Sequence, residues 1–283
     1  MRSLDPDHLR SFLAFCEGGT LLRAAQAVGR SPAALTAQMK LLEEAAGGPI
    51  LERTGRTLAL TPLGEVLRAE ARSILQAHEA ALSRLRGERA EERVALGISH
   101  DFADTRLEDC LRGFSTAHPG ARLVLHVGTS AYLNRLRDDG ALDVAITPGP
   151  VTEAEVTGET RLPMEWLAAP DIAEGARPEV LPMALLPPPC DYRTAALAAL
   201  QARAVAWRVA VESQGLAGLE AALGAGLAVT ARTRRWAGAR FVTPPADWGL
   251  PPLPSLTYRL ILRPGSGETP RALARACAAL FPG

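Results

Sequence analysis

Apolar residues recur at helical spacing through most of the first ninety positions, and capping residues divide this region into successive helices. Three of the predicted helices start with a capping residue followed by proline, at Asp5-Pro6, Ser31-Pro32 and Thr61-Pro62. Thr20 is expected to cap a shorter helix over 21–28, and the helix from Ser31 should run to about residue 46. Residues 50–60 predict a small hairpin, because Thr-Gly-Arg separates two apolar stretches. The helix after Thr61 is expected to reach about residue 89.

From residue 91 onward, short apolar runs alternate with segments of helical spacing. Strands are predicted at 94–98, 123–127, 142–146, 205–211, 224–230 and 256–262, and a closing helix at 270–280. Strands that alternate with helices are typical of a parallel sheet covered on both faces, so the predicted fold class is α/β.

The helix that begins at Ser31 has two contrasting faces. Leu35, Met39 and Leu42 fall on one stripe, which must pack against the neighbouring helices. The opposite face carries small or hydrogen-bonding side chains, as a helix needs if it is to enter the major groove of DNA. We therefore predict a helix-turn-helix over about 21–40, with candidate DNA contacts at Arg30, Ser31, Pro32, Ala33, Thr36, Ala37 and Lys40, and at Arg53 and Arg56 beside the hairpin tip. A structural three-helix bundle would share this topology, so topology alone leaves both interpretations open.

Charge and composition exclude several classes of protein. The 31 basic residues balance 31 acidic ones, which excludes a strongly basic nucleic-acid coat and an acidic disordered tail. No apolar run approaches the roughly 18 residues of a membrane span, and the N-terminus lacks an apolar signal stretch, so we expect a cytoplasmic location and no membrane partner. The histidines and cysteines show no metal-ligand spacing, and no phosphate-binding loop, dinucleotide motif or nucleophile elbow is present. Neither a metal, a cofactor nor enzymatic activity is therefore expected.

Polar residues follow several of the predicted strands. In open parallel sheets, ligands bind beyond the carboxyl ends of the strands, so these residues are candidates for an effector site. Asp101 and Glu212 would oppose an anion, which leaves a cationic effector, a neutral effector or none open. Capping of the following helices would explain the same hydroxyl residues without a ligand. The candidate effector residues are Ser99, His100, Asp101, Thr129, Ser130, Thr147, Glu212 and Ser213.

Residue identity decides between the two interpretations of the N-terminal helices. The stretches 9–15, 19–25, 31–43, 51–56 and 60–64 closely resemble the DNA-binding domain of LysR-type transcriptional regulators. This resemblance implies a winged helix-turn-helix over 4–61 that binds promoter DNA as a dimer. The start of its third helix would read base edges, and its wing arginines would contact the DNA backbone and minor groove. Pro32 and Ala37 stand where the family often has glutamine and arginine, so we expect a different operator preference or more reliance on DNA shape and the wing.

The resemblance extends, more loosely, over the rest of the chain. The stretches 93–99, 114–120, 140–146 and 224–229 resemble the family's effector-binding domain, which is shaped like periplasmic solute-binding proteins. The implied domains are a linker helix at 62–89 and an effector domain at 91–283, with lobe I at 91–161 and 258–283 and lobe II at 162–257. Residues 230–236 depart from the family's usual Leu-Pro run. The linker would dimerise through an apolar stripe that could also pack on its own chain, made of Leu63, Leu67, Ile74, His78, Ala81 and Leu85.

The sequence therefore predicts a LysR-type transcriptional regulator whose activity depends on a small-molecule effector bound between two α/β lobes. Its expected partners are double-stranded promoter DNA, the effector, RNA polymerase, and further copies of the chain in a homodimer or homotetramer. A solute-binding protein or a metabolite enzyme that uses the same cleft is the alternative. The missing signal stretch argues against the first, and the lack of a coherent acid–base or nucleophile set argues against the second.

Overall fold

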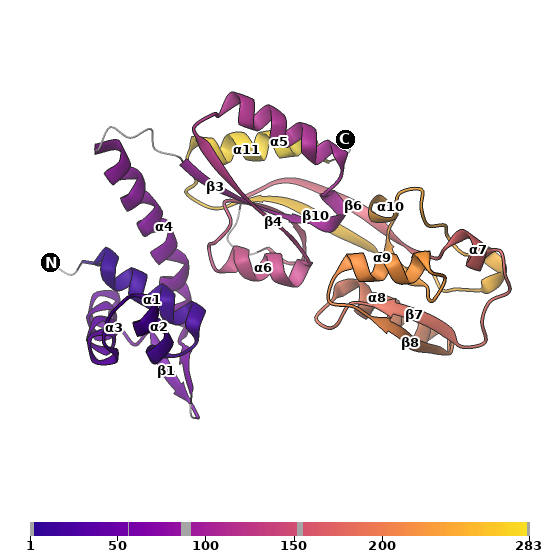
Figure 1. The fold of residues 1–283 in the computed structure, drawn as a ribbon, viewed down its shortest axis with the longest axis horizontal. Coiled ribbons are helices and arrows are strands. Elements are labelled where there is room, and N and C mark those ends of the chain that lie inside the picture. The colour runs from indigo at the N-terminus through magenta and orange to yellow at the C-terminus, as the bar shows by residue number, and fades with distance from the viewer. Residues whose placement is uncertain (1–2, 56, 86–91, 152–154, 282–283) are drawn as a thin grey trace. The chain divides into compact units, whose positions relative to one another are not determined.

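A computed structural model describes residues 3–55, 57–85, 92–151 and 155–281 (Figure 1). The chain packs as two compact units, one made of residues 1–95 with 118–124 and 135–143, and the other of the remaining residues. Arg56 and the predicted end of the long helix beyond residue 85 lie outside the described residues.

The described residues before position 86 form helices and one hairpin. The helices are α1 (Pro6–Gly18), α2 (Leu21–Ala27), α3 (Pro32–Ala46) and α4 (Pro62–Leu85), and the antiparallel strands are β1 (Leu51–Thr54) and β2 (Thr57–Leu60). Side-chain oxygens of Asp5, Thr20, Ser31 and Thr61 each accept a main-chain N–H of the first turn that follows. These caps confirm the predicted helix starts.

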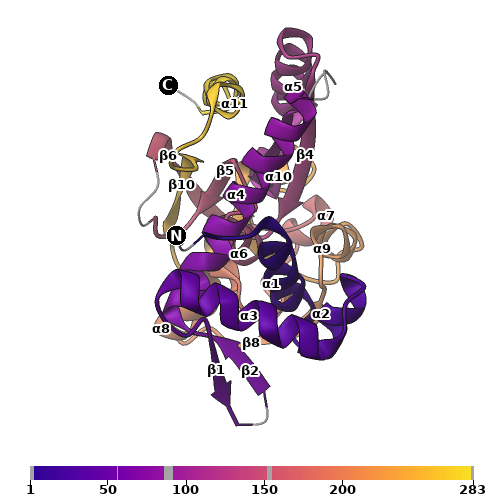
Figure 2. The same ribbon diagram turned by 90° about the vertical axis from the view of Figure 1, so that its left-hand side faces the viewer.

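The helices α1 to α4 share a small apolar core. Leu35, Met39 and Leu42 of α3 are buried, which confirms the predicted inward stripe. Leu67 of α4 is buried in the same core, in a cluster that also includes Leu9 and Phe12 of α1. The hairpin β1–β2 extends beyond the helices (Figure 2).

A six-stranded sheet lies in the remainder of the chain, with strand order β4-β3-β5-β10-β6-β9. Its strands are β3 (Glu92–Ser99), β4 (Ala121–Gly128), β5 (Val144–Pro148), β6 (Glu155–Leu167), β9 (Thr230–Thr233) and β10 (Ser255–Leu262). Strands β3 and β5 run parallel, whereas β10 runs antiparallel to both β5 and β6. The expected parallel sheet is therefore only partly parallel, because β10 runs in the opposite direction to its neighbours.

Helices cover both faces of this sheet. They are α5 (Thr105–Ala117), α6 (Ser130–Asp138) and α11 (Glu268–Ala278), and the short helix η1 (His100–Phe102) follows β3 directly. Helices α5 and α11 lie side by side on one face, and α6 lies on the opposite side (Figure 1). Along the chain, strands of this sheet therefore alternate with helices, as the sequence predicted.

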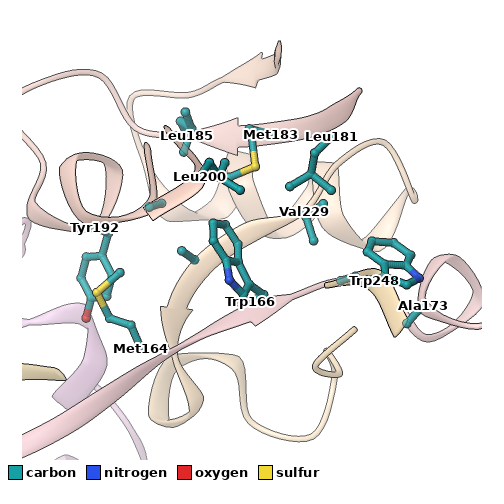
Figure 3. Packing of buried hydrophobic residues seen from close by; sticks show 13 residues of the cluster. Met164, Trp166, Ala173, Leu181, Met183, Leu185, Tyr192, Leu200, Val229 and Trp248 are labelled. Carbon is teal, nitrogen blue, oxygen red and sulfur yellow. The ribbon is translucent and has the colours of Figure 1, made fainter. Parts of the chain in front are cut away.

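A second sheet is formed by the parallel strands β7 (Leu181–Leu185) and β8 (Trp207–Glu212). The elements around it are α7 (Pro170–Ala173), α8 (Asp191–Ala202), α9 (Leu216–Gly224), α10 (Arg234–Ala237) and η2 (Ala246–Trp248). Trp166 of β6 lies in the core between these elements, with Met183 and Leu200 close by (Figure 3). Its indole nitrogen donates a hydrogen bond of 2.7 Å to the carbonyl oxygen of Pro251, so this buried polar atom has a partner.

One sequence prediction is wrong in this region, and three elements were not predicted. Residues 224–229 were expected to be part of a strand, but α9 ends at Gly224 and β9 begins only at Thr230. Gly226, with φ of 67°, turns the chain between them, a conformation that glycine adopts without strain. Strands β6 and β7 and helix α8 were not predicted. In the described part of the chain, no helix is long and apolar enough to cross a membrane.

Candidate functional site

The outward face of α3 presents a slim, accessible surface. Ala33, Thr36, Ala37 and Lys40 are exposed along it, as are Ser31 and Pro32 at its start. Because Ala33 and Ala37 add little bulk, this face can approach another surface closely. The shape and chemistry match what a helix needs to enter a DNA major groove.

The two hydroxyls on this face have different hydrogen-bonding roles. Ser31 Oγ accepts from the main-chain nitrogen of Ala34 at 3.2 Å, so its own proton remains available for a partner such as a phosphate. Thr36 Oγ1 donates to the carbonyl oxygen of Pro32 at 2.9 Å. Thr36 can therefore accept a hydrogen bond from a base edge without breaking an internal one.

The arginines predicted for DNA contact are also accessible where the structure describes them. Arg53 is exposed on β1, and Arg30 is exposed in the turn before α3. The guanidinium of Arg30 lies 3.9 Å from a carboxylate oxygen of Asp7, and both side chains are more than half exposed. Such a pair is weak in water, so Arg30 can exchange this partner for a phosphate.

A small pocket lies where several strands end. Its cavity volume is about 10 Å³, so the side chains that line it nearly fill it. The residues come from the ends of β3, β4 and β5, from the starts of η1, α6 and α8, from the segment between β7 and α8, and from β9. The lining is formed by Ser99, His100, Gly128, Thr129, Ser130, Pro148, Leu186, Cys190, Tyr192 and Arg232.

Beside this pocket, the buried carboxylate of Asp101 is surrounded by hydrogen-bond donors. Tyr192 Oη lies 3.0 Å from Oδ1, Tyr258 Oη lies 2.9 Å from Oδ2, and Ser99 Oγ lies 3.1 Å from Oδ2. Arg232 Nη2 lies 3.2 Å from Oδ2, and the hydroxyl of Thr233 donates to Oδ1. Asp101 therefore holds together residues of η1, α8, β9 and β10.

The charges in this network are fixed by their surroundings. Burial alone would raise the pKa of Asp101, but the charge of Arg232 and the surrounding hydroxyls outweigh it, so the pKa lies below its usual value. Burial raises the pKa of both Tyr192 and Tyr258, which keeps these side chains protonated as donors. Burial, followed by the charge of Arg232, lowers the pKa of His100, so its imidazole is neutral at pH 7.

Arg232 links this network to the pocket. Its side chain is only 5% exposed, and its guanidinium carbon lies 3.8 Å from the centre of the Tyr192 ring. One nitrogen, Nη2, is bonded to Asp101. Another, Nε, is buried and has no hydrogen-bond partner among the described residues.

The structure places the predicted effector residues in four different settings. Ser99, His100, Thr129 and Ser130 line the pocket, whereas Asp101 lies behind it and has its carboxylate occupied by donors. Thr147 is fully buried on β5, next to the lining residue Pro148, and its hydroxyl donates to that residue's carbonyl oxygen at 3.2 Å.

Glu212 and Ser213 are not among the residues that line the pocket. Glu212 lies 2.7 Å from the guanidinium of Arg193. Ser213 Oγ donates to the carbonyl oxygen of Gly215 at 2.8 Å, and it accepts from the main-chain nitrogen of the same residue. Both side chains therefore satisfy local hydrogen bonds at the end of β8.

Comparison with known protein families finds a match for each of two regions of the chain. Residues 6–65 match the bacterial regulatory helix-turn-helix proteins of the lysR family, and residues 87–280 match the LysR substrate binding domain. The chain belongs to the LysR family. It is a DNA-binding transcriptional regulator with an effector-binding domain, and members of this family are regulators rather than enzymes.

Individual LysR relatives match most of the chain. It is 36% identical over 259 residues to the HTH-type transcriptional regulator DgdR of Burkholderia cepacia. This match covers 92% of this chain and 88% of that protein. It is 29% identical over 262 residues to PecT of Dickeya dadantii, which covers 93% and 83%. The shared length includes both the DNA-binding and the effector-binding regions.

Solved structures show the same LysR fold. Full-length LysG of Corynebacterium glutamicum with bound effector Arg matches with a TM-score of 0.65 at 21% identity, covering 98% of each chain. ArgP of Mycobacterium tuberculosis matches with a TM-score of 0.68 at 18% identity, covering 98% of this chain and 97% of that one. The winged helix-turn-helix, linker helix and α/β effector domain expected from the sequence are therefore confirmed as the fold class.

Sequence reasoning missed Arg232 and Tyr192 of this LysR effector domain. Arg232 lies in the segment that departs from the family pattern, and that departure was the available signal. An arginine buried in a short strand needs a compensating charge, but Asp101 is 131 positions away in sequence. Tyr192 follows three consecutive prolines and Cys190, a stretch in which no periodic pattern marked the start of α8.

Proposed function

We propose that this LysR-family regulator reads promoter DNA through the outward face of α3. The observation that supports this proposal best is that every described candidate from Arg30 to Lys40 is exposed, while Leu35 and Met39 of the same helix are buried. Ser31, Ala33, Thr36 and Lys40 would contact bases or phosphates, and Arg53 of β1 would contact the DNA backbone or minor groove.

We propose further that the protein acts as a homodimer or homotetramer in the cytoplasm, where promoter DNA and RNA polymerase are found. Leu63, Leu67 and Ile74 of α4 pack into the core of their own chain. The part of the predicted dimerisation stripe left for a second copy is therefore its C-terminal half, with Ala81 partly buried and Leu85 84% exposed.

The domain boundaries at 4–61, 62–89 and 91–283 belong to the same proposal.

The pocket would hold the small-molecule effector. It lies at strand ends, where open α/β sheets bind ligands, and it is lined by residues from both proposed lobes. An effector that binds one arrangement of the lobes more tightly than another would shift the population between them and so change DNA binding. An enzymatic use of the pocket gains no support from the pocket residues, because they form no acid–base or nucleophile set.

A titration of the chain's own promoter region, followed by fluorescence anisotropy at several salt concentrations, tests DNA binding. The logarithm of the association constant should fall linearly with the logarithm of salt concentration, by about 0.9 per phosphate neutralised. Arg53→Ala should lower this slope by about one unit. Arg208→Ala, which removes an exposed arginine of β8, is the matched control and should leave the slope unchanged. An unchanged slope in Arg53→Ala would refute the wing contact.

A further inference from the structure

Two cysteines that are far apart in sequence lie in contact in the effector domain, away from the pocket. Cys110 belongs to α5 and Cys277 to α11, and their sulfur atoms are 3.7 Å apart although 167 positions separate the residues. The two helices lie side by side on one face of the six-stranded sheet (Figure 1). The tertiary structure therefore forms a dithiol from two residues that no sequence motif pairs.

The two thiols lie at different depths. Cys277 is fully buried, on the same stripe of α11 as the buried residue Leu273. Cys110 is only partly buried, at the edge between Leu107, which is buried, and the exposed face of α5. Gly113 lies one turn further along the same side of α5, and a β-carbon there would meet nothing within 4 Å. A small reactant can therefore reach the sulfur of Cys110 but not that of Cys277.

The contact also makes the two thiols unequal as acids. When Cys110 is ionised, the S–H group of Cys277 donates to its sulfur, which lowers the pKa of Cys110, and burial opposes this effect only in part. The same hydrogen bond, together with burial, raises the pKa of Cys277. The thiolate is the nucleophile in thiol–disulfide exchange, so Cys110 is the thiol that reacts first. Cys277 is then the neighbour that can attack it in a second step.

Two thiols suit a disulfide better than a metal ion. In the described ranges of the chain, no three or more His, Cys, Asp or Glu side chains are grouped so that they could hold a metal. A structural zinc site takes four protein ligands, which this pair does not supply. The two sulfurs are, by contrast, the complete set of atoms that a disulfide requires from the protein.

We propose that Cys110 and Cys277 form a site of reversible modification, at which a low-molecular-weight disulfide oxidises the two thiols to an intramolecular disulfide. The Cys110 thiolate attacks one sulfur of the small disulfide, whose S–S bond breaks, and one small thiolate leaves. Cys277 then loses its proton and attacks the Cys110 sulfur, which forms the protein disulfide and releases the second small thiolate. The two small thiolates take up the two protons that the cysteines lose. Two protein thiols are thus oxidised while one small disulfide is reduced to two thiols.

The reaction requires a short movement of the two sulfurs. An S–S bond is about 2.05 Å long, so the sulfurs must approach by roughly 1.7 Å from their separation of 3.7 Å. Rotation about the Cα–Cβ bonds moves each sulfur, and the open space beside Gly113 gives the Cys110 side chain room to turn. The bond would tie α5 to α11, so these two helices would no longer move independently over the sheet.

Peptide mapping of the full chain by mass spectrometry tests the proposal. The reduced protein is incubated with bis(2-hydroxyethyl) disulfide, its remaining thiols are blocked with N-ethylmaleimide, and its peptides are separated without reduction. A pair of peptides linked through Cys110 and Cys277 should appear, and dithiothreitol should reverse the link. In a time course, Cys110 should react at least about tenfold faster than Cys16, because burial raises the pKa of Cys16 to about 11.

Single substitutions separate the two steps. Cys277→Ala removes the second nucleophile, so the mixed disulfide between Cys110 and the small thiol should accumulate. Cys110→Ser should leave Cys277 unmodified, because that thiol is enclosed. Cys16→Ala, a matched change at another partly buried cysteine, should leave formation of the bond unchanged. Circular dichroism reports whether each variant is folded, and the wild-type peptide map tests the proposal even if a variant does not fold.

The possible results are distinct. Free thiols at both positions, or only mixed disulfides in the wild type, would show that the two sulfurs are merely packed against each other, and would overturn the proposal. Links to Cys16 or Cys190, or between two copies of the chain, would overturn the assignment of the pair. A bond between Cys110 and Cys277 that forms only in urea would show that the folded chain does not permit it, with the same consequence.

Discussion

At the residue scale, Asp101 and Arg232 form a buried ion pair in the effector domain. Both side chains are almost completely enclosed, and hydroxyls satisfy the remaining acceptor sites of the carboxylate. Removing one partner of a buried ion pair leaves an uncompensated charge, which costs far more than the pair contributes. The interaction is therefore more a constraint on the local structure than a source of net stability.

Asp101→Asn is expected to lower the free energy of unfolding by about 3–5 kcal/mol, because it leaves the charge of Arg232 without a counter-charge. Urea unfolding monitored by circular dichroism measures this. Asp247→Asn, which changes an exposed aspartate of η2, is the matched control and should stay within about 0.5 kcal/mol of the wild type. A similar small effect for both variants would contradict the importance of the pair.

The same carboxylate predicts a dependence of stability on pH. The pKa of Asp101 is lowered in the folded state, so its contribution is fully present above the unfolded pKa of about 3.9. That contribution is lost as the pH falls through the lower, folded-state pKa. Below about pH 4, the unfolding free energy of the wild type should therefore fall with decreasing pH more steeply than that of Asp101→Asn.

Thr36→Ala is expected to change which DNA sequences the protein prefers. Because Thr36 donates to Pro32, its oxygen is left to accept from a base donor, and the alanine variant loses that selectivity. Binding to a panel of promoter variants with single base changes measures the effect. Thr116→Ala on α5 removes a hydroxyl that donates to a carbonyl in the same way and should have no effect on DNA preference. A uniform loss of affinity on all sequences would show that Thr36 does not read bases.

At the element scale, the turn from the hairpin into α4 depends on a close approach. A β-carbon at Gly64 would overlap the main-chain oxygen of Ile50, so this helix position accepts only glycine without a backbone shift. Thr61 supports the same junction, since its hydroxyl donates to the carbonyl oxygen of Pro49 and accepts from the main-chain nitrogen of Gly64. These contacts fix the start of α4 against the base of the hairpin.

Gly64→Ala should therefore destabilise the N-terminal region by about 1–3 kcal/mol, the usual cost of forcing extra atoms into a packed site. Urea unfolding of the full chain measures the loss. Gly113→Ala in α5 is the matched control, because a β-carbon there meets nothing within 4 Å. That control should gain up to about 1 kcal/mol from the higher helix propensity of alanine. Equal effects of the two substitutions would contradict the close approach.

Elements with local signals could be predicted from the sequence, and those that depend on distant partners could not. The helix starts after Asp5, Ser31 and Thr61 were predicted correctly because a cap and a proline mark each one within two residues. Strand β6 was missed because most of its residues are exposed or partly exposed and its sequence includes Gly158 and Pro163. Strand β9 was missed because it contains a buried arginine, Arg232. Its counter-charge, Asp101, is brought close only by the tertiary structure.

The candidate sites divide in the same way. The exposed face of α3 follows from periodicity within one helix, so the structure exposes each of its predicted residues that it describes. The pocket collects residues from strands that are distant in sequence, and only the polar ends of β3 and β4 could be identified beforehand. Tyr192 and Arg232 required knowledge of which elements pack around Asp101.

At the scale of the whole molecule, strands β6 and β10 connect the parts of the effector domain. They pair antiparallel from Ser255 opposite Pro163 to Leu262 opposite Glu155. Beyond Pro163, β6 continues as the partner of β9, which carries Arg232. The strand that borders the pocket residue Arg232 is therefore continuous with the central sheet.

The assembly of the whole protein should depend on the end of α4. Leu85→Glu is expected to raise the dimer dissociation constant at least about tenfold, because a charge would be buried in an apolar contact between two copies. Light scattering after size-exclusion chromatography over a range of concentrations measures it. Leu227→Glu, at a position 55% exposed in the effector domain, is the matched control. Identical dilution behaviour of Leu85→Glu and the wild type would exclude this end of α4 from the interface.

The arrangement around Asp101 also restricts how this protein can diverge. An acid at position 101 and a guanidinium at position 232 are separated by 131 positions, yet neither is tolerated without the other in a buried site. Related proteins are expected to keep both or to replace both, with an apolar or amide pair, in concert. Correlated substitution at these two positions would then mark the branch of regulators that shares this buried ion pair.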